Sequence, residues 1–131
     1  MAPAVSTTPD TCGSEAEVLG SLLRLYEDEK QIYGQVLDLS RRQGEAIRRG
    51  ASLQEIMGLL ETKKNCLDTV RRLESARSRQ KRTWEMGRGS WSVAARARLN
   101  AALRTVARVI EEILACEENN DLILLEQTRE L

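Results

Sequence analysis

Apolar residues recur every three or four positions along three long stretches of this chain, with polar residues between them. The clearest row, in the first stretch, repeats at seven-residue intervals and consists of Val18, Leu25, Ile32, Leu39 and Ala46. This spacing is typical of an amphipathic helix that buries one face. Proline occurs only at positions 3 and 9, so no later residue prevents long helices.

Capping and turn signals divide the pattern into three helices. Ser14 with Glu17, and Ser52 with Glu55, have the spacing of a capping box at a helix start. Gly50 follows two arginines, which is typical of a helix end. A glycine-containing break at 87–90 separates the last stretch. We therefore expect helices over residues 15–49, 53–86 and 93–127.

The short connections predict that consecutive helices lie antiparallel. The expected fold is all-α: an elongated up-down-up three-helix bundle with coiled-coil-like packing, formed by one helical domain over residues 14–131. Residues 1–13 contain Pro, Ser, Thr and Gly and are expected to form a disordered lead-in. With two Trp, two Tyr and no Phe, the core is expected to be a thin aliphatic seam.

The stripes of the second and third helices indicate which side chains should face this seam. Lys63 interrupts the second stripe, and we expect its long side chain to reach past the seam to solvent. The second stripe comprises Leu53, Ile56, Leu60, Leu67 and Val70. The third comprises Leu99, Ala102, Leu103, Val106, Val109, Ile110, Ile113 and Leu114, followed by Cys116, Asn120 and Leu124.

Composition excludes several classes of function. There are 20 basic and 20 acidic side chains, so net charge gives no argument for nucleic acid or an anionic membrane. The chain has no His, and Cys12, Cys66 and Cys116 are widely spaced, so we expect no metal site, no cofactor and reduced thiols. We find no catalytic constellation, no signal peptide and no apolar run long enough to span a membrane. The protein is expected to be cytoplasmic and not an enzyme.

One charge run leaves a nucleic-acid alternative open. Residues 71–88 are rich in arginine and lie close to Trp84 and Trp91. Basic residues with aromatics indicate nucleic-acid binding when they cluster on one face of a basic domain. Glu74 and Glu85 interrupt this run, and the chain as a whole is neutral, which favours a solvated or internally paired face.

The most unusual segment is the run Leu122, Ile123, Leu124 and Leu125. Four consecutive helical residues point all the way round the axis, so one small bundle is expected to cover only part of this turn. The remainder is a candidate docking surface for another chain. Asn119, Asn120 and Asp121, which are poor helix formers, precede the run and suggest an adaptable joint.

Several segments together resemble the FlgN-type flagellar export chaperones over about residues 15–127. The motifs are Leu22-Leu23-Arg24-Leu25-Tyr26, Gln-x-x-Ala-Ile-x-x-Gly at 43–50, Leu59-Leu60-Glu61-x-Lys63-Lys64, Glu117-Glu118-Asn119-Asn120 and Leu122-Ile123-Leu124-Leu125-Glu126-Gln127. The resemblance rests on hydrophobic spacing, helix breaks and the asparagine-containing last helix.

The resemblance implies a small all-helical cytosolic chaperone of the flagellar type III apparatus. Such chaperones hold hook–filament junction proteins before export, and their clients bind the C-terminal helix, which corresponds here to about Ile113–Gln127. The partner-binding residues are then expected to be Ile113, Cys116, Asn119, Asn120, Leu122, Ile123, Leu124 and Leu125. The alternative is a structural or regulatory coiled coil that forms a homodimer through the same surface.

Overall fold

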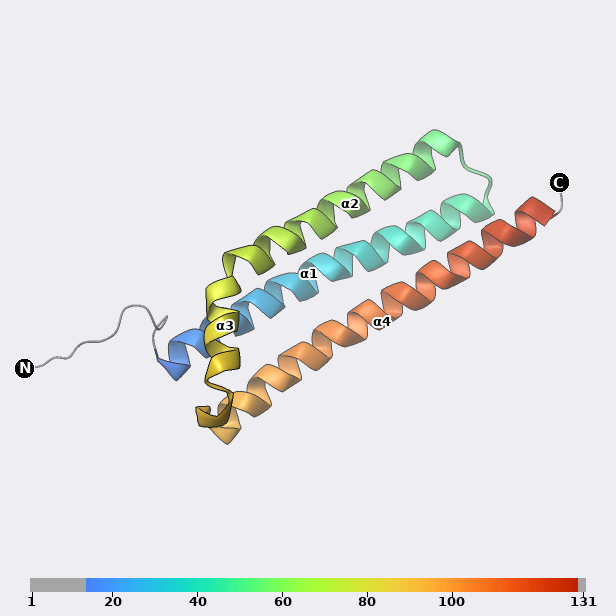
Figure 1. Ribbon diagram of the computed structural model, residues 1–131. Helices are drawn as coiled ribbons and strands as arrows, with labels where there is room; N and C mark the ends of the chain where they lie inside the picture. Colours follow the sequence, from blue (N-terminus) through green and yellow to red (C-terminus); the bar gives the residue numbers. More distant parts are fainter. Residues whose placement is uncertain (1–13, 130–131) are drawn as a thin grey trace, which may run out of the picture.

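The computed structural model describes residues 14–129, and within this range it is all-helical, without strands. The four α-helices are α1 (Glu15–Arg48), α2 (Leu53–Ala76), α3 (Ser78–Met86) and α4 (Val93–Arg129), with a 3-10 turn at Arg88–Ser90. Figure 1 shows α1 lying between α2 and α4, with the short α3 crossing near the start of α4. The expected lead-in, 1–13, lies outside the described residues.

Local capping and turn signals mark the starts of the three long helices and the end of α1. Ser14 and Glu17 form a reciprocal capping box at the start of α1. The hydroxyls of Ser52 and Ser92 each accept a hydrogen bond, 3.1 Å long, from the backbone N–H three residues later. Gly50 adopts a left-handed conformation with φ 69°, which only glycine enters without strain. These local signals set where each long helix begins and where α1 ends.

The helix predicted over 53–86 is in fact two helices, so the three-helix prediction requires correction. α2 ends at Ala76, and the N–H of Arg77 bonds to the carbonyl of Glu74 at 3.1 Å before α3 begins. Past Leu73 the sequence has no continuous apolar stripe, so a straight helix would have little to bury. The turn instead brings Trp84 against the core.

The core lies where the first half of α1 meets the start of α4. Its six buried side chains are aliphatic, and α1 supplies four of them. Half-buried side chains from α2 and α3 close this cluster on its open side. The buried residues are Val18, Leu19, Leu22, Leu25, Ala95 and Leu99, and those packed on them are Leu23, Tyr26, Leu73 and Trp84.

The stripe predicted to face inward on α2 is only partly covered, which is a second correction. Leu53, Leu60 and Leu67 are 74%, 43% and 38% exposed, whereas Val70 is buried. On α4, Leu103 and Leu114 are likewise exposed. The reason is that α2 and α4 both pack on α1 but have little contact with each other over the described residues. The sides of α2 and α4 that face one another therefore lack cover.

Candidate binding surface

The last third of α4 is fastened to α1 by polar contacts. The side-chain amide of Asn120 is buried and donates to the carbonyl of Ser40 at 2.9 Å. Two turns beyond, the amide of Gln127 donates to the carbonyl of Ile47 at 2.9 Å. Asn120 also lies directly against Gly44, where a Cβ would collide with its Oδ1. Asn120, expected to bind a partner, therefore serves an internal contact.

Lys63 carries this polar network across to α2. Its Nζ bonds to Glu117 Oε2 at 2.5 Å and to Gln43 Oε1 at 2.7 Å, and the hydroxyl of Ser40 also donates to Glu117. Burial of Glu117 opposes its ionisation, but the hydrogen bonds from Lys63 and Ser40 outweigh that effect and lower its pKa. Lys63 is buried. The expectation that it reaches solvent was wrong, because Glu117 and Gln43 satisfy its charge inside.

Asn119–Asp121, which were expected to form an adaptable joint, are part of a continuous helix in the structure. α4 is continuous from Val93 to Arg129 and passes through these residues as helix. Asparagine is a weak helix former because its side chain competes for nearby backbone groups. Here the Asn120 side chain bonds to a backbone carbonyl of α1 instead, so it fixes the position of the helix.

The apolar run after Asn120 points largely away from α1. Leu122, Leu124 and Leu125 are 55%, 50% and 59% exposed, and Ile123 is half-buried. Of the other predicted partner-binding residues, Ile113 and Cys116 are half-buried and Asn119 is exposed. The structure thus brings three leucines to the surface of a helix whose opposite side is held by Asn120 and Gln127.

Further exposed apolar side chains extend this surface, and the sequence pattern had assigned all of them except Met57 to the core. Leu114 is exposed two to three turns before the leucine run. On α2, Leu53, Met57, Leu60 and Leu67 are exposed. Leu53, Met57 and Leu60 are four and three residues apart, and Leu67 follows seven residues later. The sequence could have indicated this surface, because such a period is typical of a helix face that packs on another helix.

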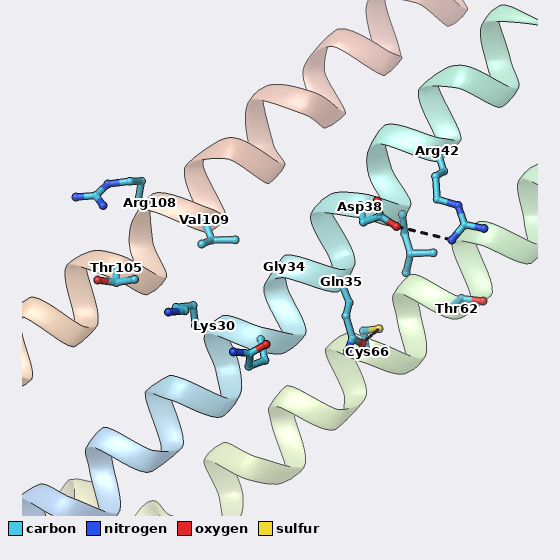
Figure 2. A pocket seen from close by; sticks show the side chains of 12 residues that line it. Lys30, Gly34, Gln35, Asp38, Arg42, Thr62, Cys66, Thr105, Arg108 and Val109 are labelled. Atoms are coloured by element: carbon cyan, nitrogen blue, oxygen red, sulfur yellow. Dashed lines mark hydrogen bonds and ion pairs between the residues drawn. The ribbon is translucent and has the colours of Figure 1, made fainter.

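A separate open cavity has a volume of about 760 Å3. Figure 2 shows the side chains of α1, α2 and α4 that line it. Its rim carries Lys30, Arg42 and Arg108, and the Arg42 guanidinium pairs with Asp38 at 3.8 Å. The Cys66 thiol donates to the Gln35 amide oxygen over 3.8 Å. This cavity holds no set of side chains arranged for acid–base or nucleophilic chemistry.

The tryptophans near the basic run contact each other. The rings of Trp84 and Trp91 stack with centroids 4.8 Å apart, and the Trp91 indole N–H donates to the Trp84 carbonyl at 2.7 Å. Within the basic run, Arg71 pairs with Asp68 and Lys81 with Glu74. These contacts favour the internally paired interpretation of the run over a nucleic-acid surface.

Within residues 14–129, no cluster of three His, Cys, Asp or Glu side chains could hold a metal ion. None of the helices in this range is long and apolar enough to cross a membrane.

Comparison with known proteins identifies the family. Residues 18–129 match the family model for FlgN proteins, which spans most of the chain and includes all of the helical surface described above. The chain belongs to the FlgN family. Comparisons with curated proteins and with solved structures gave no significant match. FlgN membership indicates a flagellar export chaperone role, in a family that is not known as enzymatic and is in general cytoplasmic.

Proposed function

We propose that this FlgN protein is a cytoplasmic chaperone that holds hook–filament junction subunits of the flagellum before export. The client binds the outward side of the last third of α4, centred on Leu122, Leu124 and Leu125. Ile113, Cys116, Asn119 and Ile123 border this site, while Asn120 supports it from behind through its bond to Ser40.

The main support for this proposal is that Leu122, Leu124 and Leu125 are exposed on a helix that hydrogen bonds hold against α1. Burying one Leu side chain contributes about 1.5–3 kcal/mol. Three leucines therefore supply about 4.5–9 kcal/mol before the cost of association. A micromolar affinity corresponds to a binding free energy of roughly −8 kcal/mol, so further contacts with the client must add to the leucines. Because the Asn120 and Gln127 contacts already fix α4 on α1, the leucines are presented without ordering a flexible segment first.

Calorimetric titration with a purified hook–filament junction subunit tests the proposal. The double variant Leu122→Asp with Leu125→Asp should weaken binding by at least about a hundredfold, because each substitution replaces a buried apolar contact with an unpaired charge. A matched control is Ala97→Asp with Ala101→Asp, which adds two charges at exposed positions elsewhere on α4. The control should bind as wild type, and circular dichroism should show unchanged helix content in both.

The homodimer alternative predicts a different result. Light scattering of the protein alone would give the mass of a dimer, and the Leu122 and Leu125 variants would reduce it to that of a monomer. Unchanged client binding in the folded leucine variant would refute the site assignment. Failure of the wild-type protein to bind any junction subunit would refute the proposed function.

A further inference from the structure

We propose that the client helix is held between α2 and α4, so that exposed leucines of α2 form the second half of the binding site. This inference rests on the proposed function and adds a docking surface that the C-terminal helix alone does not provide. The occupant is an amphipathic helix whose apolar face is bordered by acidic residues along α2 and by basic residues along α4.

The α2 side of the site is a regular seam. Its positions alternate at four- and three-residue intervals, the spacing at which one helix packs along another with a slight left-handed supercoil. All six side chains of the seam are exposed. The α2 seam consists of Leu53, Met57, Leu60, Lys64, Leu67 and Arg71.

The α4 side is also regular, with positions at alternating seven- and four-residue intervals that lie on one side of the helix. Leu103, Leu114 and Leu125 are exposed on one side of the helix, with Ile110 half-buried between the first two. Asp121, seven residues after Leu114, continues this line and is exposed. These five residues form the α4 seam, which ends in the leucine run already proposed to bind the client.

The Lys63–Glu117 pair shows that the two seams border the same space. Residues three or four positions apart lie on one face of a helix. Leu60 and Leu67 are therefore neighbours of Lys63, and Leu114 is a neighbour of Glu117. Because Lys63 Nζ contacts Glu117 Oε2, the faces that carry the seams lie toward one another. Yet Leu60 and Leu114 remain exposed, so α2 and α4 do not cover each other there.

The charged residues in and beside the two seams indicate which charges the client helix should carry. The α2 seam carries Lys64 and Arg71, of which Arg71 also pairs with Asp68 on the same helix. The α4 seam carries Asp121, with the exposed Glu118 one turn from Leu114. A helix between them would be met by cations on one edge and carboxylates on the other. An apolar face with acidic residues on the α2 edge and basic residues on the α4 edge complements both.

The direct symmetric contacts of a second copy fit this pattern poorly. A two-fold contact of α2 on α2 centred near Lys64 would bring that lysine onto its own counterpart, and a contact of α4 on α4 centred near Asp121 would bring Glu118 and Asp121 onto their copies. Like charges placed together at an interface are unfavourable. A reciprocal contact of α2 on α4 would pair unlike charges, and it is the dimer that light scattering tests below. A single client helix inserted between α2 and α4 would contact both seams at once. Together with α1, α2 and α4 it would form a bundle of four long helices.

Charge reversal in the α2 seam tests the inference without disturbing the core. Lys64→Glu with Arg71→Glu should weaken junction-subunit binding at least about fivefold at low salt and less at high salt, since exposed charges are screened. The control, Arg72→Glu with Arg82→Glu, makes the same change in net charge at exposed positions outside the seam and should bind as wild type.

Removing the apolar part of the α2 seam gives the larger effect. Leu60→Asp with Leu67→Asp should weaken binding at least about tenfold, provided that circular dichroism shows the helices intact. If neither α2 variant alters binding while Leu122→Asp with Leu125→Asp abolishes it, α2 does not contact the client, and the proposed function stands.

Two other results overturn the inference. Unchanged binding in both the α2 and the α4 variants would refute this site together with the α4 site. If the wild-type protein alone is a dimer and the α2 leucine variant is a monomer, the α2 seam is an interface between copies of this chain. Light scattering on the same samples distinguishes that outcome from client binding.

Discussion

The two ends of the bundle hold α4 against α1 by different main contacts. At the aliphatic end, Leu22 and Leu25 of α1 pack on Leu99 of α4, and Trp84 covers them. The backbone N–H and the hydroxyl of Ser92 also donate to Glu15 at this end. At the polar end, Asn120 bonds to a backbone carbonyl of α1 and Glu117 meets Lys63. Apolar packing at the first end leaves no large apolar side chain of α1 uncovered. Directional bonds at the second end fix α4 and leave its leucines facing outward.

The difference indicates that the aliphatic end mainly stabilises the fold, whereas the polar end leaves apolar surface free for a partner. Burial of apolar side chains stabilises the bundle in proportion to the area removed from water. A helix fastened by hydrogen bonds needs less of its own apolar surface for that purpose, so Leu122 and Leu125 remain available to a partner. The predictions below test this contrast.

The largest effect is expected from leucine truncation at the aliphatic end. Leu22→Ala removes a fully buried side chain and should lower the free energy of unfolding by about 3–4 kcal/mol, through lost burial and the cavity left behind. Leu122→Ala at the polar end should change it by less than about 0.5 kcal/mol, because that side chain is exposed. Urea unfolding followed by circular dichroism measures both. Equal losses in the two variants would remove the contrast.

A smaller effect is expected from the buried carboxyl between the two ends. Burial, and then a hydrogen bond and charge repulsion from Glu74, raise the pKa of Glu29 to about 8 from an ordinary value of 4.5. Lys81, which pairs with Glu74, opposes this only in part, and Tyr26 and Tyr33 lie in the same cluster. Between these two pKa values the folded protein binds more protons than the unfolded chain, so stability falls as pH rises.

Glu29→Gln replaces the titrating carboxyl with a neutral amide, so it should remove this dependence of stability on pH. The wild-type free energy of unfolding should fall by roughly 2–3 kcal/mol between about pH 5 and pH 8, whereas the Gln variant should stay nearly level. The lowered pKa of Glu74 acts below its ordinary range and does not contribute in this window. Urea titrations at several pH values measure the slope. A wild-type stability that rises over this window would contradict the assignment.

The smallest expected effect is the difference in stability between alanine substitutions at two glycines of α1. A Cβ at Gly44 would collide with Asn120 Oδ1, so Gly44→Ala should destabilise the protein by about 1–2 kcal/mol by disturbing the bond to Ser40. A Cβ at Gly34 meets nothing within 4 Å, so Gly34→Ala should stabilise it by about 0.5–1 kcal/mol through helix propensity. Thermal unfolding of both variants gives the sign of each change. A stabilising Gly44→Ala would mean that Asn120 does not hold α4.

How far the sequence predicted the fold depends on the range of the interactions involved. Ser14 with Glu17, and Gly50, act within one helical turn, and each was interpreted correctly. Leu60 was assigned to the core because its spacing marks an apolar face, but spacing does not show which neighbour covers that face. Lys63 was expected at the surface because its partner, Glu117, is distant in the chain and could not be inferred.

The sequence by itself determined where the three long helices begin, where α1 ends, and the family to which the chain belongs. These features depend on periodicity and on contacts between residues close in the chain. Only the tertiary structure decided that Asn120 points inward, that Lys63 is paired, and that the α2 and α4 seams lack cover. Those outcomes depend on the packing of three long helices, because α1 contacts both neighbours while α2 and α4 have little contact with each other.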